Sequence, residues 1–329
     1  MKTKAVTDGA MLCALAVIFS LLSYYVPFLM IFYFFIPIPA AVAANKHGIK
    51  VAVIAGASAT LILVFLMDLM SALSYGMYLL LVGCSLGYAY RKRKSGFVRL
   101  GWAYVATLLT VSLSLVLLQL LLGQNFIAEF SAAVDQTIAG IRQMYEAMAS
   151  DSSTQQMLSA EQLSAVTGML DNLGRAVKLM VPGSFLMAPF ILGWINVVVA
   201  DKVMARLKLP VEKLPPLSQW RLPKSLATFL ILMIVFLLFA DLLNWDFIPE
   251  IYTFTLTNLC YMVYALAGMG FVFWFINRKR AKESMGFKVL AVAVCFFFSW
   301  LSYLLIFLGV ADTYVDLRRF IAFNGGDHR

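Results

Sequence analysis

Charged residues are scarce in this sequence. Of its 329 residues 13% are charged and 62% are apolar, and the mean hydropathy is +0.86. A water-soluble domain is typically about a quarter charged and about half apolar. The composition therefore excludes a soluble globular enzyme, a disordered protein and a nucleic-acid-binding domain, so no nucleic-acid partner is expected. It predicts a protein that is embedded in the lipid bilayer.

Histidine and cysteine are also rare. The two histidines, His47 and His328, lie in a predicted loop and near the end of the sequence. Thiols inside a membrane span behave as small apolar residues, and metal sites need clustered ligands. We therefore expect no metal site, no haem and no other cofactor. All four cysteines fall inside predicted spans without metal-ligand spacing: Cys13, Cys84, Cys260 and Cys295.

Several catalytic signatures are missing as well. The sequence has no phosphate-binding loop of the Gly-x-x-x-x-Gly-Lys type, which argues against ATP hydrolysis by this chain. The predicted spans contain no histidine that could serve as the base for a serine nucleophile. They also lack paired acids, and a proton-coupled carrier normally buries at least one. We expect no catalytic residues, and neither an enzyme nor a proton-driven pump.

Long apolar runs are what the sequence does have. A helix needs about 20 mostly apolar residues to cross the hydrocarbon core, and windows of that length predict an all-α polytopic protein with nine spans. The loops richest in lysine and arginine alternate along the chain, which predicts an internal N-terminus and an external C-terminus. The predicted spans are 8–24, 27–44, 49–67, 70–90, 97–123, 177–200, 225–243, 253–276 and 288–310.

The first two predicted spans are short, and Pro27 lies at their junction. Two explanations stay open. Either both spans are short, or one of them is irregular and buried against protein, where unpaired backbone groups find partners.

Residues 124–176 predict an external hairpin of two amphipathic helices, joined by a polar turn at 150–154. Apolar residues recur there at spacings of three and four, which is typical of a helix with one apolar face. The hairpin could be a lid or a partner-docking element, or it could pack its own apolar stripes together. The two stripes are Ile127, Phe130, Val134, Ile138, Ile141, Tyr145 and Met148, and Leu163, Val166, Leu170, Leu173, Val177 and Met180.

A proline-rich, basic connector over 201–224 divides the chain. Its prolines, Pro210, Pro215, Pro216 and Pro223, predict a stiff, extended and cytoplasmic segment. We therefore expect a membrane domain over 1–200 with spans one to six, and a three-span region over 225–329.

The polar residues inside the spans are neutral. A buried amide or hydroxyl in a membrane serves either as a contact between helices or as a ligand contact. If the protein binds a small solute, the first candidates are Trp194, Asn196, Asn258 and Tyr261.

The N-terminal residues carry a resemblance. Asp8-Gly9-Ala10-Met11-Leu12-Cys13-Ala14-Leu15-Ala16 is followed by Ile36-Pro37-Ile38-Pro39 and by Asn45-Lys46-His47-Gly48. This pattern resembles the S-components of energy-coupling-factor vitamin transporters over roughly the first 200 residues. The resemblance implies that Ala10 and Ala14 dock on a membrane-embedded T-component, which works with partner ATPases. S-components usually have six spans, so nine spans depart from their pattern.

The chain as a whole resembles the YybS-like family of Firmicute membrane proteins. The hairpin and the C-terminal stretch Leu308-Gly309-Val310-Ala311-Asp312, with Asp316 and Arg318, carry this resemblance. It implies a multi-pass protein of a bacterial plasma membrane and assigns no activity. Two functions follow as hypotheses. One is a solute-binding transport component that lacks its own ATPase. The other is a scaffold or regulator that recruits a cytoplasmic or envelope protein.

Overall fold

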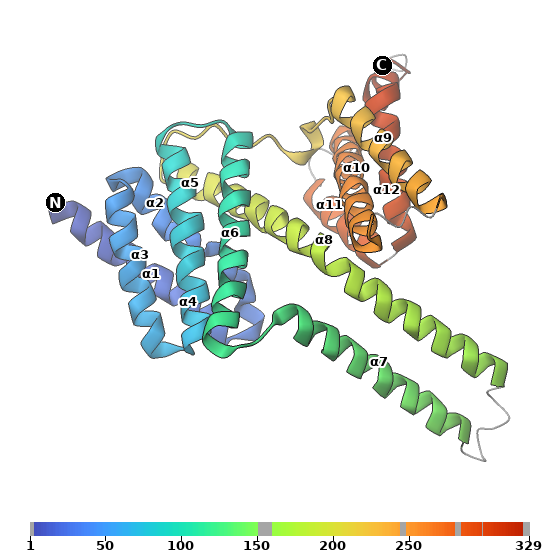
Figure 1. Cartoon of the computed structure of the whole chain (residues 1–329). Coiled ribbons are helices and arrows are strands. Elements are labelled where there is room, and N and C mark those ends of the chain that lie inside the picture. Colours follow the sequence, from blue (N-terminus) through green and yellow to red (C-terminus); the bar gives the residue numbers. More distant parts are fainter. Residues whose placement is uncertain (1–2, 151–159, 244–247, 280–283, 298, 325–329) are drawn as a thin grey trace. The chain divides into compact units, whose positions relative to one another are not determined.

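The structure is a computed structural model that describes residues 3–150, 160–243, 248–279, 284–297 and 299–324. Every regular element in these residues is a helix, so the predicted all-α class is confirmed (Figure 1). The chain forms two compact units, Met1–Leu214 and Pro215–Arg329. Each is described by itself.

Seven helical stretches of the described residues are long and apolar enough to cross a membrane. Six belong to unit 1 and the seventh, Glu250–Arg278, belongs to unit 2. Two shorter apolar helices, Lys224–Ala240 and Leu301–Val315, lie in unit 2 as well. The prediction of a multi-pass helical protein agrees with these stretches.

Unit 1 is built around α2 (Pro37–His47), a helix whose first eight residues are buried. Its residues 37–44 are all buried, and α5 covers them closely because Gly83 and Gly87 leave room for the α2 backbone. The other elements of unit 1 are α1 (Thr3–Tyr25), η1 (Pro27–Phe35), α3 (Ile49–Leu66), α4 (Leu69–Met77), η2 (Tyr78–Val82), α5 (Gly83–Arg91), α6 (Gly96–Leu122), α7 (Phe126–Ser150) and α8 (Ala160–Arg206).

The second predicted span is the irregular one. Its first part, η1, is a 3-10 helix that begins at Pro27, and its second part is the buried helix α2. Pro27 and Pro37 each lie at the start of a helix. The backbone N–H groups of a first turn have no partner within the helix, so the missing N–H of proline costs no hydrogen bond there. Neither of the two explanations left open describes the whole segment, because the irregular part, η1, has no buried residue and the buried part, α2, is a regular α-helix.

The segment predicted as a hairpin contains α7 and the first half of α8, which pack against each other. The ion pairs Arg142–Asp171 and Lys178–Asp135 join them, the latter at 2.6 Å. Exposed apolar side chains remain in both stripes, among them Ile127 (66% exposed) on α7 and Leu173 (54%) on α8. The two stripes therefore cover each other only in part. The predicted turn lies outside the described residues except for Ser150.

Unit 2 has a core where α9 meets α10. Ala227 and Leu230 of α9 pack there against Cys260 and Tyr264 of α10, and the Tyr264 hydroxyl donates to the Ala227 carbonyl at 2.5 Å. The elements of unit 2 are η3 (Leu217–Gln219), α9 (Lys224–Leu242), α10 (Glu250–Lys279), α11 (Ser284–Phe297), α12 (Ser299–Val315) and α13 (Leu317–Asn324).

The residues predicted as a ninth span, 288–310, do not form one straight helix. Lys288 of α11 lies 6.0 Å from the Phe273 ring of α10, whereas the backbone of Leu305 in α12 contacts Gly268 of α10. A straight helix from 288 to 305 would be about 25 Å long, but positions 268 and 273 are only about 8 Å apart along α10. The chain must reverse between the two contacts, so α11 and α12 run in opposite directions (Figure 1). The prediction of a single span was wrong.

This reversal brings the C-terminal helix back to the connector. Arg318 of α13 donates to the carbonyl oxygens of Ser218 at 2.6 Å and Trp220 at 3.1 Å, and it pairs with Asp312 at 2.9 Å. The predicted topology put 201–224 inside and the C-terminus outside. Groups on opposite sides of a membrane cannot form these hydrogen bonds, so that combination was wrong.

Candidate functional site

A buried amide and a buried phenol meet in the centre of unit 1. The Asn196 amide nitrogen on α8 donates to the Tyr78 hydroxyl at 2.7 Å, and both side chains are at most 1% exposed. Tyr78 begins η2, a five-residue π-helical segment between α4 and α5. Such a segment shifts the side chains that follow it and often occurs at functional sites.

A series of tyrosines, the aromatic column, leads to Asn196 and consists of Tyr24, Tyr75, Tyr33 and Tyr78. The Tyr33 ring is stacked on Tyr78 at 4.6 Å between centroids, and Tyr75 meets Tyr33 edge-on at 5.6 Å. Tyr24 lies 6.4 Å from Tyr75. These contacts form an unbroken path of rings from an exposed tyrosine to the buried Asn196.

The exposed end of the aromatic column is anchored by Asp68. Its carboxylate accepts from the Tyr24 hydroxyl at 2.7 Å and from the Ser71 backbone N–H at 2.9 Å. The second bond caps the first turn of α4. Hydrogen bonds from Ser71 and Tyr24 lower the pKa of Asp68 to about 2. The carboxylate is therefore charged at neutral pH.

The buried end of the aromatic column has a free acceptor. The side-chain oxygen of Asn196 is buried and has no hydrogen-bond partner among the described residues. A buried polar atom without a partner costs about 1–3 kcal/mol, and it can accept a hydrogen bond from a bound molecule.

The predicted solute-binding residues do not form one cluster in either unit. Trp194 and Asn196 belong to α8 in unit 1, whereas Asn258 and Tyr261 belong to α10 in unit 2. The Asn258 amide donates to the Phe254 carbonyl of its own helix at 2.8 Å. Asn196 is instead hydrogen-bonded to Tyr78 at the end of the aromatic column, which sequence reasoning missed.

The two alanines predicted for partner docking line an apolar groove of about 440 Å³ between α1 and α3. Small residues on a membrane helix allow another helix to approach its backbone closely. Val6 and Ile54 on the groove's walls are 53% and 56% exposed. The groove is lined by Ala5, Val6, Gly9, Ala10, Cys13, Ala14, Val51, Ile54, Ala55, Ser58 and Ile62.

A buried ion pair stands where α6 begins and α8 ends. Arg99 is 1% exposed and donates to Asp201 at 3.0 Å, and the Tyr90 hydroxyl donates to the same carboxylate oxygen at 2.6 Å. The other oxygen of Asp201 accepts from the Leu214 backbone N–H at 2.8 Å. Arg99 also donates to the carbonyl oxygens of Lys94 and Glu212. The pair thus fixes the first part of the connector to unit 1.

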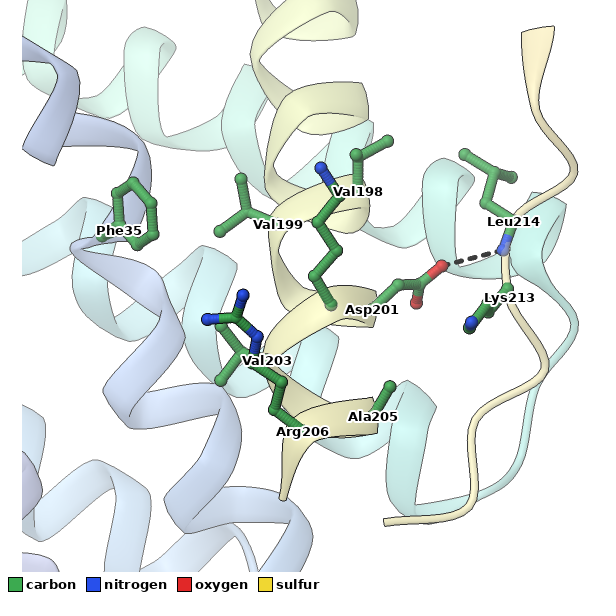
Figure 2. A pocket seen from close by; sticks show the side chains of 10 residues that line it. Phe35, Val198, Val199, Asp201, Val203, Ala205, Arg206, Lys213 and Leu214 are labelled. Atoms are coloured by element: carbon green, nitrogen blue, oxygen red, sulfur yellow. Dashed lines mark hydrogen bonds between the residues drawn. The ribbon is translucent and has the colours of Figure 1, made fainter. Parts of the chain in front are cut away.

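A pocket of about 600 Å³ lies beside this ion pair. Figure 2 shows Val199, Val203 and Arg206 on α8, Phe35 on a second segment, and Lys213 and Leu214 on the connector. Sequence reasoning missed this basic pocket, because a count of charges along the connector does not show that they lie beside an apolar wall. Its lining is Phe35, Val198, Val199, Asp201, Lys202, Val203, Ala205, Arg206, Lys213 and Leu214.

Metal ligands are not clustered in the part of the chain that the structure describes. No group of three or more histidine, cysteine, aspartate or glutamate side chains there could hold a metal ion. His328 lies outside the described residues, and so does the side chain of Cys295.

Comparison with known proteins places the whole chain in one family. A family described as "Predicted membrane protein (DUF2232)" matches residues 14–313. A protein of Bacillus subtilis (strain 168) with the name "Uncharacterized protein YybS" is 24% identical over 318 residues, which is 96% of this chain and 98% of that protein. No solved structure matches the chain. The resemblance to S-components stays a prediction, whereas the resemblance to the YybS-like family is confirmed. The chain belongs to the DUF2232 family of predicted membrane proteins.

Proposed function

We propose that this protein is a small-solute-binding component of a transport complex that relies on partner proteins for energy. The observation that carries the proposal is the division of the chain. Unit 1 contains six candidate spans, the number usual for the S-components that the first 200 residues resemble. A nine-span domain departs from that pattern, and a six-span unit agrees with it.

The groove between α1 and α3 supplies the contact with a partner. Ala10 and Ala14 line it together with Gly9 and Ser58, so a helix of a T-component could approach the α1 backbone closely. Through a partner docked in this groove, the ATPases could move unit 1. This chain would then need no nucleotide-binding motif of its own.

The aromatic column supplies the contact with a solute. A planar organic molecule could stack on Tyr33 or Tyr78 and donate a hydrogen bond to the free oxygen of Asn196. No catalytic role is proposed for any residue of this site.

Affinity purification of the full chain from native membranes in mild detergent tests the proposal. We expect a second integral membrane protein and ATPase subunits to co-purify, and we expect Ala10→Leu to release them because its larger side chain fills the groove. The matched control is Ala128→Leu on α7, an exposed alanine outside the groove. Retention of the same partners by Ala10→Leu would refute docking in the groove.

A non-transport scaffold or regulator is the second candidate. The observation that favours it is the exposed apolar surface of α7 and α8, which includes Met169 (73% exposed) and Met144 (54%). Such a surface suits a protein partner. Recovery of one soluble protein, without ATPases and through this surface, would favour the scaffold.

A further inference from the structure

We propose that the basic pocket binds the headgroup of an acidic phospholipid. The pocket combines two kinds of lining that a lipid requires. Lys202, Arg206 and Lys213 supply three cations, and Phe35, Val198, Val199 and Val203 supply an apolar wall. A phosphate at the cations and an acyl chain along the apolar wall would satisfy both.

The cations are free to act on a ligand. Lys202, Arg206 and Lys213 are exposed, and none forms an ion pair with a carboxylate of the described residues. The only acid in the lining, Asp201, is already neutralised by Arg99 at 3.0 Å. Its oxygens accept from Tyr90 and from the Leu214 backbone as well. The pocket therefore presents positive charge to whatever enters it.

The buried ion pair also holds one of the cations in position. The Leu214 N–H donates a hydrogen bond to Asp201 (Figure 2), and the Glu212 carbonyl accepts one from Arg99. The backbone on both sides of Lys213 is therefore fixed. Lys202 and Arg206 are one turn apart on α8 and share a face of that helix. A pocket organised before binding loses less entropy when a ligand enters.

The place in the chain favours a lipid over a soluble anion. The pocket lies at the end of a candidate span, Ser164–Arg206, where a helix leaves the hydrocarbon core and meets the headgroups. Basic pockets between helices at this level are known to bind acidic lipid headgroups. This inference goes beyond the proposed function, since it concerns neither the groove nor the aromatic column.

Native mass spectrometry of the delipidated full chain tests the inference. The protein in mild detergent is mixed with phosphatidylglycerol or with phosphatidylcholine of the same acyl chains. We expect one retained phosphatidylglycerol and at least tenfold weaker binding of phosphatidylcholine, whose headgroup has no net charge. Equal binding of the two lipids overturns the inference.

Three glutamine variants locate the site. Lys202→Gln, Arg206→Gln and Lys213→Gln should each weaken phosphatidylglycerol binding about fivefold, and the triple variant about a hundredfold. Lys208→Gln is the matched control, because Lys208 lies on the same segment but does not line the pocket. If Lys208→Gln weakens binding as much as Lys213→Gln does, the effect is one of general charge and the pocket assignment is wrong.

Competition with inorganic phosphate separates a lipid from a soluble anion. We expect 10 mM phosphate, roughly the upper end of the concentrations present in cells, to displace little of the bound lipid, because it makes no contact with the apolar wall. Complete displacement at that concentration would mean that the pocket holds a free anion, and the lipid assignment would fail.

Discussion

At the scale of single residues, the polar groups inside unit 1 are few and closely paired. Asn196 with Tyr78 and Arg99 with Asp201 each join segments far apart in the sequence, with separations of 118 and 102 residues. Buried polar groups cost free energy when they lose a partner. The effects on stability of mutating the two members of one pair should therefore not be additive.

Tyr78→Phe should destabilise the protein, because it leaves the Asn196 amide without its acceptor. We expect a loss of about 1–3 kcal/mol. The double variant Tyr78→Phe/Asn196→Leu should recover part of this loss, since no buried donor remains. Thermal unfolding in detergent of the wild type, of Tyr78→Phe, of Asn196→Leu and of the double variant measures the coupling energy between the two side chains. Strictly additive losses of stability would contradict the paired arrangement.

Asp68→Ala should lower the stability by about 1 kcal/mol, because it removes the cap of α4. Asp68→Asn should keep most of the cap at neutral pH. The folded-state pKa of Asp68, about 2, is below the unfolded value of about 3.9. The charged Asp68 therefore contributes its full stabilisation at a pH above its unfolded-state pKa, and this stabilisation is lost as the pH falls through the folded-state pKa. Unfolding measured between pH 2 and 7 should show that acid loss in the wild type and not in Asp68→Asn.

The sequence predicted Asn196 as a site residue but not the tyrosines near it. A lone amide in an apolar span is visible in a local window, whereas the stacking of Tyr33 on Tyr78 depends on how η1 and η2 pack. The pairing of Arg99 with Asp201 was missed for the same reason. A window that counts charge cannot show that Arg99 turns inward to a distant aspartate.

At the scale of elements, close helix packing depends on small residues. α10 and α12 cross at Gly268 and Gly309, and a methyl group on either glycine would overlap the backbone of the other helix. The crossing therefore requires glycine at both positions.

Gly268→Ala should destabilise unit 2 by about 1–3 kcal/mol through this overlap. Gly286→Ala on α11 is the control, because a methyl group there has no neighbour within 4 Å. Alanine favours a helix over glycine by about 1 kcal/mol, so the control should be neutral or slightly stabilising. Limited proteolysis in detergent can follow both variants, and equal resistance to the protease would argue against a tight crossing.

Apolar windows predicted several helix bounds to within one residue but did not show the reversal within 288–310. The predicted span 49–67 is α3, Ile49–Leu66, and the predicted span 97–123 is α6, Gly96–Leu122. Residues 288–310 were equally apolar, yet they form parts of two helices. Hydropathy reports that a segment is buried in lipid or protein, but it does not report a reversal of the chain.

At the scale of the whole molecule, the two ends of the connector are fixed by two buried arginines. Arg99 holds the part near Glu212 in unit 1, and Arg318 holds Ser218 and Trp220 in unit 2. If the connector is cytoplasmic, the C-terminal helix is on the cytoplasmic side too. Arg318 and Arg319 then lie on the inner side, which strengthens the inward bias of lysine and arginine.

A reporter fused to the C-terminus tests this topology. We expect a green fluorescent protein fusion to fluoresce and an alkaline phosphatase fusion to be inactive, because both report an internal end. Fusions at position 224 should behave in the same way. An active phosphatase at the C-terminus together with an inactive one at 224 would contradict the contact between Arg318 and Ser218.

The proposed function requires that the groove between α1 and α3 hold a membrane partner, one that provides the energy for transport. The most direct test is a photo-crosslinking amino acid at Val6, which is 53% exposed on the groove, in cells that express the full chain. The same probe at Phe65, 81% exposed and outside the groove, is the control. We expect Val6 to capture a membrane subunit of an ATP-driven complex, Ala10→Leu to abolish the capture, and Phe65 not to reproduce it. Capture of no such subunit at Val6, or equal capture at Phe65, would contradict the claim.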